Sequence, residues 1–381
     1  MLGNLINLIF RWLSIRRWNN YPRIEEFTEN EHISLKLQIS FIVSKILQEK
    51  WHKINLTYIY KSFFWNSFFT FIYSDIKFDV KNYLKNQYPQ IYQKLWQQIL
   101  DFFQTLNLPN QLIDDFYEIV QNKHNNLFTQ KNNIETDIIN FTKAFETKLE
   151  IENNARFYPR SYQNIPKTID QQIKNISQKI WFNELELLKN YCSNLIKLKF
   201  AYRWNKMKRN YPVSVLAHLF LVFSFSYILW KLKNFNNKQL EDILNKSLLH
   251  DIPEALTWDV ITPTKKAAPG FTKVLEGIEE KLVDKYIINI FSKYKFINQF
   301  KTYLLHPFEW ENWKIAKYSD HLSALFESKI EEQEYFERIY KDIKKFLWKI
   351  NDTELDYILK YWIDYFDEDV EVKWKKFIWI D

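Results

Sequence analysis

The scarcity of glycine is the feature that most limits what this chain can fold into. Its 381 residues include only three glycines, Gly3, Gly270 and Gly277. Phosphate-binding loops and dinucleotide-binding fingerprints need several closely spaced glycines, because their backbone must approach the phosphates. The sequence therefore excludes both kinds of site. Long segments rich in Leu, Ile, Lys, Glu and Asn, with so few glycines between them, predict an all-α fold.

Composition and charge narrow the class of partner. Apolar residues make up 46% of the chain, which is enough to fill the cores of two domains. The net charge of +7 comes from lysines interleaved with Glu and Asp, a pattern typical of a solvated surface. It suits a small phosphorylated substrate and makes nucleic acid a less favoured partner. The single cysteine, Cys192, excludes an internal disulfide and predicts a reducing, cytoplasmic location.

Two apolar segments raise the question of a membrane. The N-terminal stretch MLGNLINLIFRWLSIRR places its basic residues after the apolar ones, the reverse of a signal peptide. It could be an amphipathic anchor, but we favour a helix packed on the protein. Residues 213–230 are just long enough to span a bilayer, yet they include His218 and three serines. We therefore predict a buried core helix there and no membrane partner.

The stretch LLHDIPEALTWDVITPTKK, residues 248–266, concentrates side chains that can do chemistry. An apolar run leads into His250 and Asp251, so both sit near the end of an expected helix. A neutral imidazole beside a carboxylate is half of a divalent-cation site. Glu254 and Asp259 follow closely enough to handle a water molecule or a leaving group.

Two further segments complete the pattern. His218 lies in SVLAHLFLVF and Asp320 lies in AKYSDHLSALFESKIE. A lone histidine on an apolar helix is more often a satisfied core residue, but the order H…HD…D on successive helical segments resembles the HD superfamily of metal-dependent phosphohydrolases. Together with AYRWNKMKRNYPVSVLAH, roughly residues 190–335 are similar to the bacterial HD-domain 5'-nucleotidases, which hydrolyse deoxyribonucleoside 5'-monophosphates.

The resemblance implies a centre built around one divalent metal ion. The residues that would hold the ion are His218, His250, Asp251 and Asp320. Mixed histidine and carboxylate ligation suits Mn²⁺, Co²⁺, Fe²⁺, Ni²⁺ or Zn²⁺, and the sequence does not choose between them. The resemblance also implies Glu254 and Asp259 as the catalytic carboxylates, with Asp259 orienting or deprotonating the attacking water.

The same resemblance assigns substrate contacts to four residues. Arg203 would clamp the phosphate, for which a guanidinium fork is well matched. Trp204 would line the sugar-binding part of the site, where its bulk could exclude a 2'-hydroxyl. Thr262 and Lys265 would contact phosphate, and a plain loop role is the alternative for both.

The first half of the chain resembles a degenerate copy of the second. SIRRWNNYPRIEEFTENEHISLKLQISFIV lines up with FAYRWNKMKRNYPVSVLAHLFLVFSFSYIL, and Trp and His are fourteen positions apart in both. Ser74 then stands in place of a metal histidine, and Ile139 in place of a metal aspartate. The alternative is coincidence between two Lys- and Phe-rich helical segments. We predict tandem HD-like bundles, a degenerate one over residues 1–180 and an active one over 181–381 with a C-terminal helical extension.

The sequence thus predicts a metal-dependent phosphohydrolase acting on (deoxy)nucleoside 5'-monophosphates. One alternative is an HD-type nucleoside triphosphate hydrolase or single-strand nuclease, which the basic charge and abundant aromatics allow. Another is a nucleotide-binding regulatory protein. Because related nucleotidases act as homodimers, the fused copy could replace a second subunit. The chain would then be a pseudo-dimeric monomer, with a homodimer as the alternative.

Overall fold

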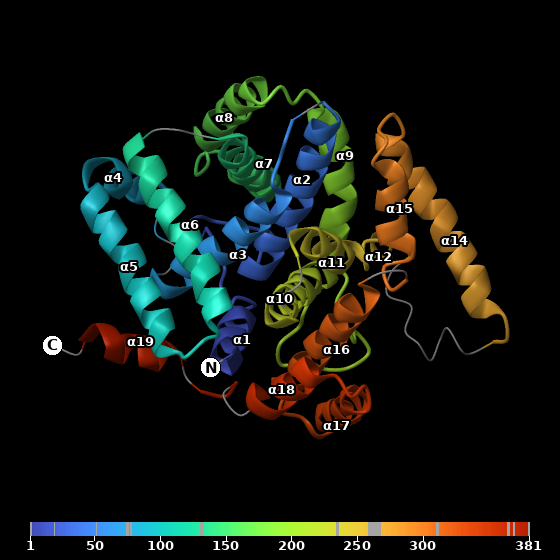
Figure 1. Ribbon diagram of the computed structural model, residues 1–381. Helices are drawn as coiled ribbons and strands as arrows, with labels where there is room; N and C mark the ends of the chain where they lie inside the picture. The colour runs from blue at the N-terminus through green and yellow to red at the C-terminus, as the bar shows by residue number, and fades with distance from the viewer. Residues whose placement is uncertain are drawn as a thin grey trace.

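All regular secondary structure in the described part of the chain is helical, which confirms the predicted all-α class (Figure 1). The computed structural model describes residues 2–379 except 19, 51, 74–75, 77, 130–132, 234–235, 258–267, 310–311, 364–365 and 369. The first half contributes α1 (Leu2–Arg11), α2 (Glu29–Glu49), α3 (Leu56–Tyr73), α4 (Phe78–Gln87), α5 (Pro89–Thr105), α6 (Asn110–Thr129), α7 (Ile134–Phe157) and α8 (Ile165–Lys179). The second half contributes α9 (Leu185–Leu195), η1 (Ile196–Lys199), α10 (Val215–Lys233), α11 (Asn237–Leu249), α12 (Glu254–Thr257), α14 (Phe271–Tyr286), η2 (Ile288–Phe291), α15 (Ile297–Leu305), α16 (Trp313–Lys329), α17 (Glu334–Trp348), α18 (Thr353–Tyr361) and α19 (Val370–Trp379).

Two helices, α2 and α10, form the centre of the molecule and pack against each other (Figure 1). Each is flanked by two helices of its own half: α3 and α7 pack on α2, while α11 and α16 pack on α10. Because α2 and α10 also touch, the buried apolar side chains of both halves join into one hydrophobic core. The two halves are therefore packed together rather than linked as separate bodies.

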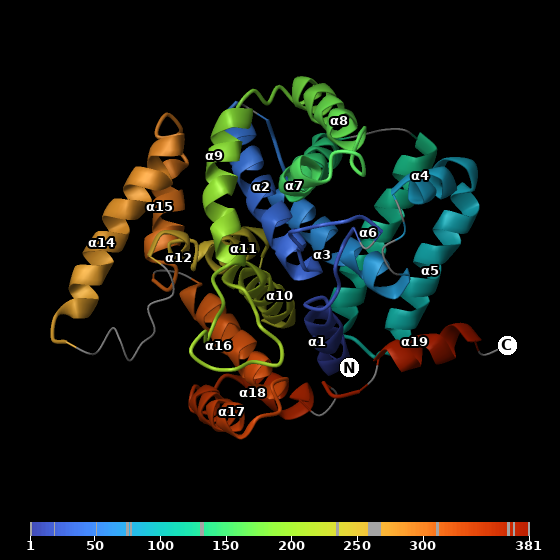
Figure 2. The ribbon, with the colours of Figure 1, turned by 180° about the vertical axis from the view of Figure 1, so that it is seen from behind.

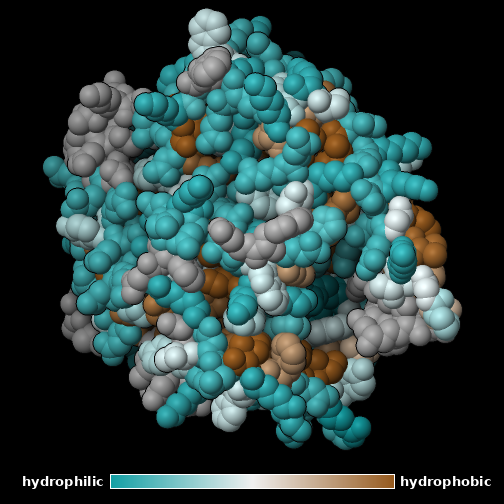
Figure 3. Space-filling model, turned by 45° about the vertical axis from the view of Figure 1, so that its right-hand side comes forward, coloured by the Kyte–Doolittle hydropathy of each residue, from teal (hydrophilic) through white to brown (hydrophobic). Residues whose placement is uncertain are grey.

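The central position of α10 follows from its sequence. Its residues VLAHLFLVFSFSYILW are all buried, so the helix has no face suited to water. Among the described residues it is the helix that could cross a membrane by length and composition, and most of it is enclosed by protein. On the face shown in Figure 3 the surface is largely hydrophilic, with hydrophobic side chains in separate small patches.

The N-terminal helix α1 is packed on the protein, as expected from its amphipathic sequence. Eight of its ten residues are buried, and it lies against α18 and α19 of the C-terminal extension. The rings of Phe10 and Phe366 meet edge to face at 5.6 Å, and Asn7 donates to the Glu368 carbonyl at 3.2 Å. The two ends of the chain thus pack together (Figure 1).

The loop between η1 and α10 lies beside α16, as the view from behind shows (Figure 2). Its start and end are joined by a β-bridge between Tyr202 and Ser214. The Glu331 carboxylate, just beyond α16, accepts hydrogen bonds from Arg209 at 2.7 Å and from the backbone N–H of Asn210. These contacts fix the Arg-Trp segment next to the helix that carries Asp320.

Candidate metal centre

Three helices bring the predicted metal ligands together. His218 is the fourth residue of α10, His250 caps the C-terminus of α11 with Asp251 directly after it, and Asp320 lies in the middle of α16. Because α11 and α16 both pack on α10, residues up to 102 positions apart meet at one point.

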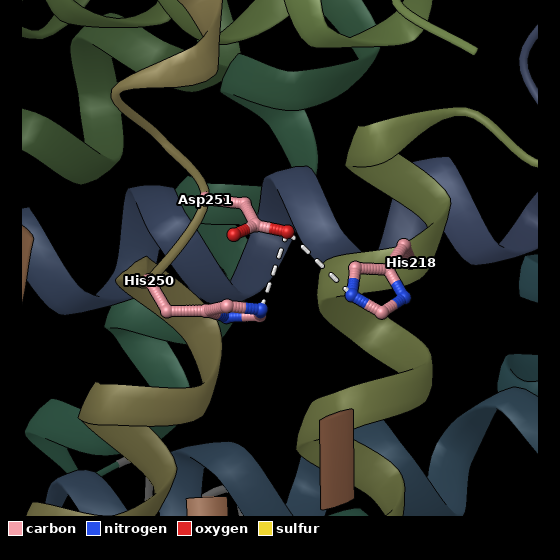
Figure 4. A group of neighbouring side chains, drawn as sticks. All are labelled: His218, His250 and Asp251. Atoms are coloured by element: carbon pink, nitrogen blue, oxygen red, sulfur yellow. Dashed lines mark ion pairs between the residues drawn. The ribbon is translucent and has the colours of Figure 1, made fainter. Parts of the chain in front are cut away.

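The four side chains face one another at short range. His218 Nε2 lies 3.6 Å from Asp251 Oδ2 and 3.4 Å from Asp320 Oδ1, and His250 Nε2 lies 3.3 Å from Asp251 Oδ2. One ligand atom each from His218, His250 and Asp251 lies within 4.8 Å of the others. Figure 4 shows the Asp251 carboxylate directed at both imidazoles. This spacing suits a single ion between them.

The two imidazoles present unused nitrogen atoms to this centre. The Nε2 atoms of His218 and His250 are buried and have no hydrogen-bond partner among the described residues. His250 donates from Nδ1 to the Ser247 carbonyl at 2.9 Å, which leaves the Nε2 lone pair free. Buried polar atoms are rarely left without a partner. Two such nitrogens beside two carboxylates fit a divalent cation.

The electrostatics of the centre favour a bound positive charge. Burial alone would raise the pKa of Asp251, but His250 and His218 outweigh it and lower the pKa to about 2. The pKa of Asp320 is held well below its usual range, because the neighbouring His218 and His250 side chains and the Arg203 guanidinium overcome the effect of burial. Burial would lower the pKa of His250, and the Asp251 carboxylate raises it instead. Both aspartates are therefore anionic at neutral pH.

Comparisons with known proteins give a match over the part of the chain that carries this centre. The profile of the family described as YfbR-like 5'-deoxynucleotidases matches residues 190–366. The match covers just under half of the chain, and because it includes the H…HD…D pattern we refer to this range as the HD domain. Among solved structures, an HD-domain phosphohydrolase from Listeria innocua is similar over 49% of this chain and 92% of its own, at 22% identity and a TM-score of 0.40. No curated protein matches the chain. The matched range of the HD domain contains every predicted metal ligand.

Around the centre, the HD domain has a second layer of contacts that the sequence did not single out. His218 Nδ1 lies 3.1 Å from both Glu327 Oε1 and Ser323 Oγ, and Arg203 Nη1 also contacts it. Glu327 is fully buried, and although burial opposes ionisation, Arg203 and His218 lower its pKa to about 2. Asp320, Ser323 and Glu327 are spaced by three and four residues, so they share one face of α16. This spacing from Asp320 is the feature of the sequence from which Ser323 and Glu327 could have been predicted.

Arg203 and Trp204 lie at the edge of the centre. Arg203 Nη1 is 3.6 Å from Glu327 Oε1, and its side chain is 16% exposed. Burial alone would lower the pKa of Arg203, but carboxylates led by Glu327 raise it above its ordinary value. Trp204 has a left-handed backbone (φ 53°) and packs against Phe336 of α17, with ring centroids 5.4 Å apart. Its ring is half-buried and keeps some exposed surface.

Other predicted site residues divide into described and undescribed ones. Glu254 begins α12, and its charge is among those that raise the pKa of Arg203, so it faces the same region. Asp259, Thr262 and Lys265 lie outside the described residues, and their predicted roles stay predictions. Lys317 was not predicted; its Nζ lies 3.5 Å from Asp320 Oδ2, which adds a cation to the edge of the centre.

The first half contains a second cluster of possible metal ligands, made by His32 of α2 and Glu146 and Glu150 of α7. His32 Nδ1 contacts Glu146, and Nε2 lies 2.9 Å from Glu150 Oε1. Trp18 Nε1 donates to the other oxygen of Glu150 at 2.7 Å. Both nitrogens of His32 are thus already paired. Burial would lower the pKa of His32, but the two glutamates raise it, as expected of an imidazolium between carboxylates.

Besides the two histidines, other structural features are repeated in the two halves. A β-bridge joins Arg16 to Thr28 before α2, as one joins Tyr202 to Ser214 before α10. The backbone φ of Trp18 is 59°, close to that of Trp204. These contacts support the interpretation of the first half as a copy. Ser74, which we aligned with a metal histidine, lies outside the described residues.

Proposed function

We propose that the HD domain removes phosphate from deoxyribonucleoside 5'-monophosphates with the help of one divalent ion. The observation that carries the proposal is the pair of buried, unpartnered Nε2 atoms of His218 and His250, which face the anionic carboxylates of Asp251 and Asp320. The matching family, YfbR-like 5'-deoxynucleotidases, suggests the substrate class. When bound, the ion would polarise the phosphoryl group and acidify a water molecule.

The centre is open to a small substrate. The side chains of Asp251 and Asp320 are 26% and 20% exposed, so water and a phosphate group can reach them. Arg203 and Lys317 place two cations beside these carboxylates. A guanidinium fork can donate to phosphate oxygens while one of its nitrogens faces Glu327. We assign phosphate binding to Arg203, with support from Lys317.

Trp204 is the candidate for recognising the sugar. Phe336 packs against its ring, and the Arg209 guanidinium lies 4.9 Å from the ring centroid. These neighbours hold the ring in one orientation and leave part of it exposed next to Arg203. A rigid ring beside a bound phosphate would sit against the ribose and disfavour an added 2'-hydroxyl.

The test is phosphate release by purified protein with Mn²⁺ or Co²⁺ on a panel of dNMPs, NMPs, dNTPs and single-stranded DNA. We expect dNMPs to react faster than the matching NMPs, and Trp204→Ala to narrow that difference. Trp18→Ala, the equivalent change in the first half, is the control and should leave the selectivity unchanged. Equal rates on dAMP and AMP with the unmutated protein would refute the sugar preference and point to a different phosphoester.

A second candidate substrate, single-stranded nucleic acid, is favoured by one surface feature. The C-terminal part of α17 and the residue after it carry Lys341, Lys344, Lys345 and Lys349 around Trp348, which is 55% exposed. Lysines interleaved with an exposed aromatic ring suit a polynucleotide strand. Phosphate release from DNA, with none from any dNMP, would select this alternative.

We further propose that the first half is a structural partner of the HD domain and carries no metal chemistry. His32 has no free nitrogen, because Glu146 and Glu150 occupy both of them. The first half instead covers α10 through α2. It would take the place of the second subunit of a homodimer.

A further inference from the structure

Glu327, Ser323 and Arg203 all converge on the one nitrogen of His218 that faces away from the metal centre. Glu327 Oε1 and Ser323 Oγ each lie 3.1 Å from His218 Nδ1, and Ser323 donates to Glu327 at 3.0 Å. Arg203 Nη1 contacts the same Nδ1 atom. His218, Ser323 and Glu327 are fully buried, so water does not compete for these contacts.

These partners cannot all be satisfied at once, because they require different tautomers of His218. A guanidinium has donors and no acceptor, whereas an ionised carboxylate has acceptors and no donor. If Nδ1 carries the hydrogen, it donates to Glu327, and the Nε2 lone pair points at the metal centre. If Nδ1 accepts from Arg203, the hydrogen moves to Nε2, and His218 cannot bind a cation there.

We infer that Glu327 is a positioning residue that keeps His218 in its metal-binding tautomer, an inference that rests on the proposed metal-dependent function. Glu327 does this in two ways. Its carboxylate accepts from Nδ1–H, and its charge offers Arg203 an alternative partner at 3.6 Å. Arg209, at 3.5 Å from Glu327 Oε2, holds the carboxylate in place from the other side. Carboxylates behind metal-bound histidines generally act in this way.

The test measures metal affinity directly, so that it does not depend on which substrate the protein hydrolyses. Co²⁺ binding to the full-length protein would be followed by visible absorption, in competition with a chelator. We expect Glu327→Gln to weaken binding about 10- to 100-fold, and Glu327→Asp to restore part of the loss. Adding Arg203→Met to Glu327→Gln should recover affinity, because the competing donor is removed.

Glu331→Gln is the matched control. Glu331 lies one turn beyond Glu327, is equally buried and is held by Arg209 at 2.7 Å, but no described contact joins it to His218. Its loss should leave Co²⁺ affinity unchanged, even if unfolding becomes easier. Wild-type Co²⁺ affinity in folded Glu327→Gln protein would overturn the inference, and so would an equal loss in Glu331→Gln.

A milder variant keeps the inference testable if Glu327→Gln does not fold. Ser323→Ala deletes only a hydroxyl group. That group can accept a hydrogen bond from His218 Nδ1 and donates one to Glu327. We expect its Co²⁺ affinity to fall about 2- to 10-fold, the equivalent of one hydrogen bond, and unchanged affinity would contradict the inference. Absence of nucleotide hydrolysis with normal Co²⁺ binding would instead refute the proposed function alone.

Discussion

His32 and His218 are the fourth residues of the two central helices, and comparing their surroundings shows what separates the halves. In both, Nδ1 faces a glutamate, Glu146 on α7 or Glu327 on α16. The difference lies at Nε2. For His218 this atom has no partner and faces two aspartates, whereas for His32 it lies 2.9 Å from Glu150. A carboxylate of the chain itself thus takes the place that an ion would take in the second half.

The loops next to these helices explain why Glu150 is available. Its counterpart Glu331 is occupied by Arg209 and by backbone N–H groups of the Arg-Trp loop. In the first half Asn154 accepts from the corresponding loop, from the backbone N–H of Ile24 at 2.8 Å. Glu150 is therefore free to turn toward His32. The comparison teaches that histidines at the same position of the two central helices can be paired differently, depending on which carboxylate the neighbouring loop leaves available.

Water access differs between the two centres as well. The side chains of Glu146 and Glu150 are 0% and 3% exposed, against 26% and 20% for Asp251 and Asp320. A substrate can approach only the second pair. Both observations point to chemistry in the second half alone.

The sharpest test of this asymmetry compares Asp251→Asn with Glu150→Gln. We expect Asp251→Asn to remove the bound ion and to lower the rate of phosphate release about a thousandfold or more, because several kcal/mol of transition-state stabilisation are lost with the ion. Glu150→Gln, assayed where circular dichroism shows it folded, should stay within about twofold of the unmutated rate.

Metal content per chain, measured by mass spectrometry, completes that test. We expect one ion per full-length chain and none in Asp251→Asn protein. Two ions per chain would show that His32, Glu146 and Glu150 also hold metal. Full activity of metal-stripped Asp251→Asn protein would refute the metal-dependent mechanism.

Removing the first half should abolish the soluble monomer. A chain that starts at Asn175 loses the surface that covers α10, along with contacts such as Ser214 Oγ to Glu31 at 2.6 Å and Tyr60 OH to Asn245 at 2.7 Å. Each Å² of apolar surface uncovered costs about 25 cal/mol. We expect aggregation or a homodimer in size-exclusion chromatography with light scattering. A soluble, active, monomeric fragment would show that the packing between halves is dispensable.

The sequence was sufficient for the fold class and for the residues that meet at the centre. Scarce glycine predicted helices, and the spacing of His218, His250, Asp251 and Asp320 marked four side chains that the structure does bring together. Such motifs can be read from sequence because each of these residues lies on a helix or directly after one.

The partners of those ligands could not be predicted in the same way. Glu327 is one of many glutamates in a charged chain, and its importance depends on which face of α16 meets α10. Ile139 and Ser74 suggested that ligands were missing from the first half. Glu150 pairs with His32, however, because Asn154 accepts the backbone hydrogen bonds of a loop that is distant in sequence. The sequence does not show this contact.

The ion cluster of the first half should matter for stability even though it does no chemistry. His32→Ala would leave Glu146 and Glu150 buried close together without the imidazolium between them. Breaking a buried ion pair in this way typically costs about 3–5 kcal/mol. We expect a loss of that size in urea unfolding followed by circular dichroism. A loss below about 1 kcal/mol would mean that the cluster contributes little, and that Arg17 alone compensates the glutamates.

The smallest expected effect is the pH dependence of that stabilisation. Burial opposes ionisation of Glu146, but His32 lowers its pKa from 4.5 to about 2. Its contribution is therefore complete above pH 4.5 and is lost as the pH falls toward 2. The pKa of His32 is raised from 6.5 by the two glutamates, so its contribution is complete below pH 6.5 and is lost as the pH rises through the raised value.

We expect the unfolding free energy of the unmutated protein, minus that of a His32→Gln/Glu146→Gln variant, to peak between pH 4.5 and 6.5. The fall on the acid side, from the Glu146 shift, should be on the order of 3 kcal/mol, and the difference should also fall on the alkaline side as His32 loses its proton. Measuring both proteins with a chelator present keeps the metal centre out of the difference, and a difference that stays flat from pH 3 to 8 would contradict the pairing.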